Sequence, residues 1–161
     1  MIVVSDTSPL NYLQRIDRLE LLAQIFDAVL IPPAVYREWQ RGFSDPSAPT
    51  HAWLRVATPR DRAAVRSLRI VLDECEAEAI ALAVERHAEL LLIDEEDGRA
   101  AAVERGLKIM GVLGVLVRAK GLGLLPAVRP EIDRLLSETN FYCKPSLLNQ
   151  VLALAGETPN P

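Results

Sequence analysis

Cysteine, aromatic residues and long hydrophobic runs are scarce in this sequence, and each scarcity excludes a class of protein. The chain has 161 residues and two cysteines, Cys75 and Cys143, which stand far apart without metal-ligand spacing. This excludes a disulfide-rich secreted domain, so we expect reduced thiols and a cytoplasmic location. The longest apolar runs are too short to cross a membrane, and the first residues lack the basic and apolar regions of a signal peptide.

Positive charge and glycine-rich nucleotide-binding motifs are lacking too. The formal net charge of −4 argues against a strongly basic nucleic-acid coat, although it is compatible with a local basic patch. Neither the dinucleotide pattern G-x-G-x-x-G after the first predicted strand nor the P-loop pattern is present. His51 and His87 are isolated, so neither a histidine zinc site nor a Ser–His–Asp triad is indicated.

The remaining composition is that of an ordinary soluble protein, with 50% hydrophobic and 25% charged residues. We expect one domain over residues 1–156 and a flexible tail over residues 157–161. Short aliphatic runs alternate with segments in which the apolar residues recur at helical spacing. This alternation predicts an α/β fold with a parallel sheet covered by helices. The predicted strands are residues 2–4, 28–31, 53–57, 90–93 and 107–110. The predicted helices are residues 10–16, 19–25, 33–41, 73–86, 100–105, 112–119, 126–136 and 144–155, with a loop over residues 43–50.

The first ten residues place an acid at the end of a strand. The aliphatic run 2–4 favours a buried strand, Ser8 is a good N-cap, and Pro9 suits the first turn of a helix. Asp6 is therefore expected at the carboxyl end of the strand, where open α/β sheets bind ligands. The alternative is that Asp6 only closes a turn. A haloacid-dehalogenase-type phosphatase has a second acid two residues later, but this chain has Ser8 there.

A second acid, Asp94, follows the clearest buried strand. Because parallel strands present their carboxyl ends on one side, we expect Asp6 and Asp94 to be neighbours. Glu76 opens the helix before that strand, and topology alone does not place it. Each acid also has a structural interpretation, since Asp73-x-x-Glu76 resembles a capping box and Asp94-x-x-Asp97 could cap the next helix.

The combination of acids favours metal chemistry. Clustered carboxylates repel each other and have raised pKa values unless a cation neutralises them. Oxygen ligands with water in the remaining positions suit Mg²⁺ or Mn²⁺. Such an ion polarises a phosphodiester and activates water, so the pattern points to metal-dependent phosphodiester hydrolysis.

One segment is locally basic in this acidic protein. It contains Arg55, Arg60, Arg62, Arg66 and Arg69. A solvated helix face is the preferred interpretation, and a phosphate-contacting patch is the alternative.

Several short motifs, in order and spacing, resemble the PIN-domain superfamily. The resemblance is to the toxin-type (VapC-like) ribonucleases and a related prokaryotic PIN-like branch, and it runs from Val3 to about Gly156. The motifs are SDTSPL at residues 5–10, IPPAVYRE at 31–38, EAEAIALA at 76–83, LIDE at 92–95 with Gly98-Arg99, and GVLGVL at 111–116.

The resemblance implies a three-layer α/β/α fold with a short, mostly parallel sheet of about five strands. It implies that Asp6, Glu76 and Asp94 are the catalytic and metal-binding acids, with the start of the Glu76 helix directed toward the site. Glu78 is the less favoured ligand, because it faces elsewhere on the helix. The supporting residues that the resemblance implies are Ser8, Glu38, and either Glu95 or Asp97.

The activity implied is that of a Mg²⁺- or Mn²⁺-dependent endoribonuclease, acting as the toxin of a toxin–antitoxin pair. The expected partners are RNA, contacted by Arg62, Arg66 and Arg99, a small antitoxin protein and a second copy of the chain. The apolar helix 112–119 is either the dimer interface or part of the core. Val112 stands where the branch usually has threonine, and the alternative function is a catalytically silent binding module. No base-reading signature is visible.

Overall fold

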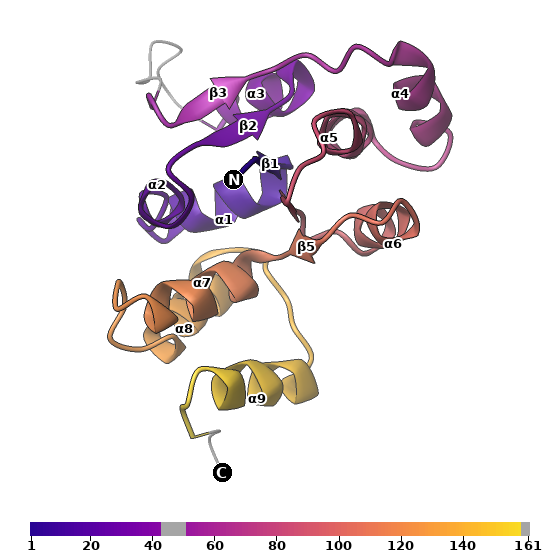
Figure 1. The fold of residues 1–161 in the computed structure, drawn as a ribbon. Coiled ribbons are helices and arrows are strands. Elements are labelled where there is room, and N and C mark those ends of the chain that lie inside the picture. Colours follow the sequence, from indigo (N-terminus) through magenta and orange to yellow (C-terminus); the bar gives the residue numbers. More distant parts are fainter. Residues whose placement is uncertain (43–50, 159–161) are drawn as a thin grey trace.

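The structure is a computed structural model that describes residues 1–42 and 51–158, so the loop predicted at residues 43–50 lies outside the described residues. In the described part the sheet has five parallel strands in the order β3-β2-β1-β4-β5 (Figure 1). This confirms the predicted α/β/α fold. The strands are β1 (Val3–Ser5), β2 (Val29–Ile31), β3 (Leu54–Val56), β4 (Leu90–Leu92) and β5 (Ile109–Met110).

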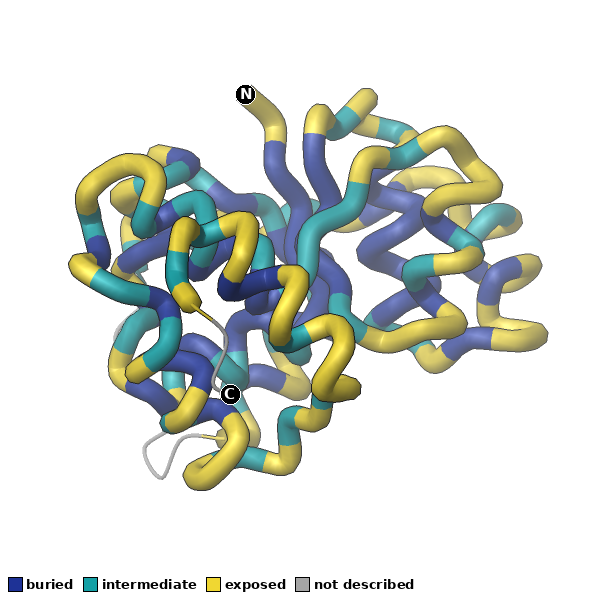
Figure 2. Tube along the Cα trace, turned by 90° about the horizontal axis from the view of Figure 1, so that it is seen from below, coloured by how far each residue is buried: buried dark blue, intermediate teal, exposed yellow. Residues whose placement is uncertain are grey.

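Helices cover both faces of this sheet. Val3, Leu90 and Leu92 belong to one hydrophobic core, whereas Val4 and Leu91 belong to the other, because successive strand residues point to opposite faces. Figure 2 shows buried residues running through the middle of the molecule. The helices are α1 (Thr7–Arg15), α2 (Leu21–Phe26), α3 (Pro33–Gln40), α4 (Arg62–Leu68), α5 (Glu74–Glu85), α6 (Glu96–Glu104), α7 (Val112–Gly121), α8 (Arg129–Glu138) and α9 (Pro145–Leu154).

Helices α1, α2, α7, α8 and α9 pack on the first face. Helices α4, α5 and α6 pack on the second. Val112, Val115 and Leu116 are fully buried in the first core. The apolar side of α7 is therefore core, and the interpretation of this side as a dimer interface is wrong.

The last described residues contact the start of α8. The Glu157 carboxylate accepts hydrogen bonds from Lys120 Nζ at 3.0 Å, Val128 N at 2.7 Å and Arg129 N at 3.1 Å. The carboxylate satisfies amide groups at the start of α8, which a local sequence pattern does not reveal. The flexible tail over residues 157–161 stays a prediction, because residues 159–161 lie outside the described residues.

Among the helices of the described part, none is long and apolar enough to span a membrane.

Candidate active site

The sheet brings Asp6 and Asp94 to the same edge. Strands β1 and β4 pair in parallel with Ser5 opposite Leu92, and the Asp6 backbone N–H donates to the Leu92 carbonyl at 2.9 Å. Asp6 follows β1 directly, and Asp94 comes two residues after β4 ends. The two acids thus stand at the carboxyl ends of neighbouring strands, as the sequence pattern indicates.

Asp6 is the most deeply buried of the site's acids, with only 2% of its surface exposed. Its Oδ1 atom has no hydrogen-bond partner in the described part of the chain. Burial raises the pKa of this carboxyl to about 8, the Thr7 backbone N–H lowers it in part, and the nearby Asp73, Glu76 and Glu38 carboxylates raise it further. A buried carboxylate oxygen without a donor is costly, so it calls for a cation or a proton.

The position of Glu76, which strand order alone does not determine, is given by the start of α5. Helix α5 begins with a capping box, in which Asp73 accepts from the Glu76 backbone at 2.8 Å and Glu76 accepts from the Asp73 backbone at 3.1 Å. Burial raises the pKa of Glu76, and the Asp73, Glu95 and Asp97 carboxylates add to the rise. The capping and site interpretations are therefore compatible, because the capped start of α5 lies among the site's acids.

Asp94 is held by the backbone that follows β5. Both of its carboxylate oxygens accept from the Val112 backbone N–H at 3.1 Å. A Cβ on Gly111 would lie 2.5 Å from Asp94 Oδ1, so glycine leaves the space that the carboxylate occupies. Burial raises the pKa of Asp94 to about 6, opposed by the Val112 N–H and the Arg99 charge. The N-cap of α6 is Glu95, so Asp94 does not cap this helix.

The supporting residues join the start of α1 to its neighbours. Ser8 Oγ donates to Glu95 Oε1 at 3.2 Å, and Thr7 Oγ1 donates to Glu38 Oε2 at 2.9 Å. Cys75 Sγ donates to the same Glu38 oxygen at 2.7 Å. Sequence reasoning missed Thr7 and Cys75, although each adjoins a predicted site residue. Asp97 is exposed on the first turn of α6, and its charge helps to raise the pKa of Glu76.

The neighbouring Glu78 has a different role from Glu76. It is 3% exposed, and its carboxylate accepts from Ala34 N at 3.0 Å and from Arg62 Nη1 at 3.2 Å. Glu78 thus fastens the start of α3 to α5 and engages one of the three predicted RNA-contacting arginines. Of the other two, Arg66 is exposed on α4, and Arg99 donates to the Ile93 carbonyl at 2.8 Å beside Asp94.

Divalent metal binding by these acids depends on how closely they are grouped. Within residues 1–42 and 51–158, no three or more His, Cys, Asp or Glu side chains are grouped so that they could hold a metal ion. Asp6, Glu76 and Asp94 therefore do not form a ready cage of three ligands. The donor chemistry still fits Mg²⁺ or Mn²⁺, because Mg²⁺ keeps several waters and needs only one or two carboxylates, and Asp6 Oδ1 is buried without a partner.

The chain was compared with known proteins. No curated protein matches the sequence significantly. A family model described as a PIN domain matches residues 2–157, which is nearly the whole chain. The parallel sheet between two helix layers agrees with the fold of that family. The chain therefore belongs to the PIN domain family.

Proposed function

We propose that this protein is a Mg²⁺- or Mn²⁺-dependent endoribonuclease that hydrolyses RNA phosphodiester bonds at its cluster of carboxylates. PIN domains are generally nucleases, and they generally use divalent metals. The observation that carries the proposal is the buried Asp6 carboxylate, which has an unpartnered Oδ1 and lies at the sheet edge among other acids. Such an arrangement is stable when a cation supplies the missing partner.

Each residue of the site would have a separate role in the reaction. Asp6 and Asp94 would hold the ion, which supplies polarisation of the phosphodiester and activation of water when it is bound. The Val112 N–H and the bare Gly111 fix the Asp94 carboxylate in one orientation. Thr7 and Cys75 orient Glu38 near Asp6, and Arg99 offsets part of the negative charge at Asp94.

Cleavage of an end-labelled structured RNA tests the proposal directly. With Mg²⁺ or Mn²⁺ we expect internal cuts, because the acids need a cation to approach a phosphodiester. With EDTA we expect none. Cutting that persists in EDTA would contradict the metal-dependent mechanism. No cutting together with no metal binding would favour the catalytically silent module.

RNA binding is proposed to involve Arg66, which is exposed and has no ion pair among the described residues. Replacing Arg66 with alanine is expected to reduce the slope of log affinity against log salt by about 0.7, the value for one phosphate contact to a single strand. Arg86→Ala is the matched control, since Arg86 is also exposed but ends α5. Equal slopes for the two variants would rule out this contact. Arg62 is unsuitable, because its loss would leave Glu78 buried without its partner.

We extend the proposal to a toxin role, in which a small antitoxin covers the site. The supporting observation is a groove of about 460 Å³ beside Asp94, lined in part by Phe141, Tyr142 and Leu147. Tyr142 is 76% exposed and Leu147 is 43% exposed. Large exposed apolar side chains next to an acidic site suit an apolar segment of a partner protein. A short reading frame next to the gene for this chain would support the role.

A further inference from the structure

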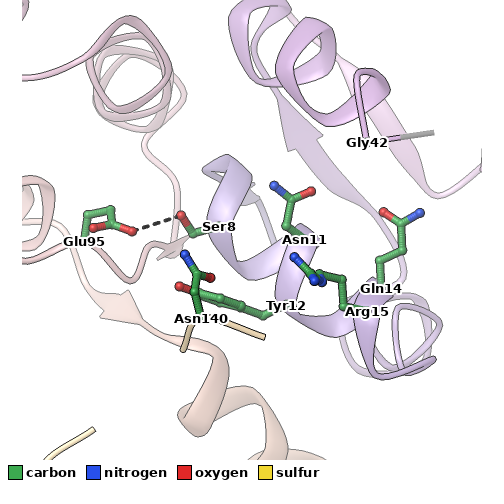
Figure 3. A pocket seen from close by; sticks show the side chains of 8 residues that line it. All are labelled: Ser8, Asn11, Tyr12, Gln14, Arg15, Gly42, Glu95 and Asn140. Carbon is green, nitrogen blue, oxygen red and sulfur yellow. Dashed lines mark hydrogen bonds between the residues drawn. The ribbon is translucent and has the colours of Figure 1, made fainter. Parts of the chain in front are cut away.

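A second, polar groove of about 590 Å³ lies along α1 and starts at the acidic site (Figure 3). Ser8, Asn11, Tyr12 and Arg15 all line it. Their spacing of three and four residues puts them on one face of the helix. The opposite side of the groove includes Asn140, which follows α8 and is remote in sequence.

The groove is continuous with the site's acids. At its near end Ser8 donates to Glu95 at 3.2 Å, and Glu95 directly follows Asp94. Tyr12 also links the two regions, because burial raises the pKa of its hydroxyl and the Glu95 and Asp94 carboxylates raise it further. A chain that passes the acidic edge would therefore continue into the groove.

The groove is lined by side-chain amides that have no hydrogen-bond partner among residues 1–42 and 51–158. The side chains of Asn11, Gln14 and Asn140 line it and make no hydrogen bond with the described part of the chain. Figure 3 shows the Asn11 and Gln14 amides on α1, with Asn140 on the neighbouring segment. Each amide has donors and an acceptor in one plane, which matches the edge of a nucleobase.

The aromatic wall of the groove is held in a fixed position. The Tyr12 ring meets the Phe141 ring edge to face, with centroids 5.2 Å apart and an interplanar angle of 80°. Arg15 lies at the far end, where its Nη2 donates to the Glu138 carbonyl at 3.3 Å. Bases of single-stranded RNA stack on aromatic side chains and are read by amides, whereas phosphates are met by arginines.

We propose that this groove binds a nucleotide of single-stranded RNA next to the scissile phosphate and reads its base through Asn11 and Gln14. The inference rests on the proposed ribonuclease function. The lining favours base recognition over simple phosphate binding, because it holds three neutral amides and only one arginine among the described residues. The groove therefore determines which sequences are cut, and the carboxylates perform the cutting.

The test is selection of RNA by binding without metal. A pool of random single-stranded RNA is bound to the whole protein in EDTA, and the bound fraction is sequenced. The groove variant is Asn11→Ala with Gln14→Ala, which favours helix formation and keeps α1 intact. The control is Asn149→Ala with Gln150→Ala, two exposed residues of α9 outside the groove.

The wild type and the control are expected to enrich one base at a fixed position. The groove variant is expected to lose this enrichment and to bind the selected sequence at least about tenfold more weakly, since the loss of one amide–base contact alone accounts for about tenfold. The same enrichment in the groove variant, or none in the wild type, would overturn the proposal. Because EDTA removes catalysis from the test, a failure of the nuclease proposal would show only in the cleavage assay.

Discussion

Replacing Asp6 with asparagine is expected to reduce metal-dependent RNA cleavage by more than about 100-fold. Loss of an outer-shell partner of a metal ligand already costs about 10- to 100-fold in affinity or activity, and Asp6 is proposed as a ligand itself. Asparagine has the same shape but carries no charge, so it would attract the cation far less. The measurement is kcat/KM on one end-labelled RNA in Mg²⁺ and in Mn²⁺.

The fold of the Asp6→Asn variant is expected to persist. The substitution keeps the volume of the side chain in a buried position, and it removes a carboxylate that is costly to ionise there. Circular dichroism and thermal unfolding of the variant check this.

Asp133→Asn is the matched control, because Asp133 is an exposed acid on α8 whose side chain is 65% accessible. This control should cleave RNA like the wild type. Full activity of Asp6→Asn would remove Asp6 from the site, and equal losses in both variants would indicate a general effect of charge.

The elements that position Asp6 could be predicted because their signals are local. An aliphatic run followed by Ser8 and Pro9 gives a strand, a turn and a helix within ten residues. Proline in the first turn likewise predicts α3 after the strand that ends at Ile31. Parallel pairing then places Asp94 at the same edge of the sheet as Asp6, without any knowledge of side-chain contacts.

The parts of the site that sequence reasoning left open depend on three-dimensional contacts. Glu76 lies near Asp6 because the start of α5 is directed toward the carboxyl ends of the strands, which strand order alone does not determine. The space around Asp94 depends on Gly111, because a Cβ at this position would collide with the Asp94 carboxylate. The polar groove is lined by both Asn11 and Asn140, which are more than 100 residues apart in the sequence. A local motif could therefore not predict it.

The stability of the metal-free protein is expected to fall as the pH rises from about 6 to about 8. The folded-state pKa of Asp6, about 8, lies above the ordinary value of 3.8 for an aspartate. The folded protein therefore binds more protons than the unfolded chain between these two values, and stability decreases with rising pH in that window. Each group in this situation contributes up to about 1.4 kcal/mol per pH unit, so we expect a loss of about 1 to 3 kcal/mol.

This pH window separates the effect of Asp6 on stability from the effect of Asp94. The pKa of Asp94 is raised only to about 6, so Asp94 adds little to the change in stability above pH 6. Urea unfolding in EDTA at about pH 6, 7 and 8 gives the slope for the wild type. Asp6→Asn has no group that titrates at this position, and its stability should change less over the same range.

Addition of Mg²⁺ or Mn²⁺ is expected to restore the stability lost at about pH 8. The ion binds the ionised carboxylate, so it competes with the proton and has its largest effect where the proton has already left. At a concentration about 100 times the dissociation constant, binding to the folded state adds about 2.7 kcal/mol. For a chain of this length that corresponds to a rise in Tm of roughly 5 to 10 °C.

The two measurements together separate the proposed nuclease from the silent module. A fall in stability that metal reverses in the wild type but not in Asp6→Asn would mean that the buried carboxylate is maintained for a cation. A fall that metal does not reverse would mean that the acids cluster without binding one, which favours a module that binds RNA or protein. A constant stability would contradict the burial of Asp6 with its Oδ1 atom unpartnered among the described residues, because a hydrated carboxylate would keep its ordinary pKa.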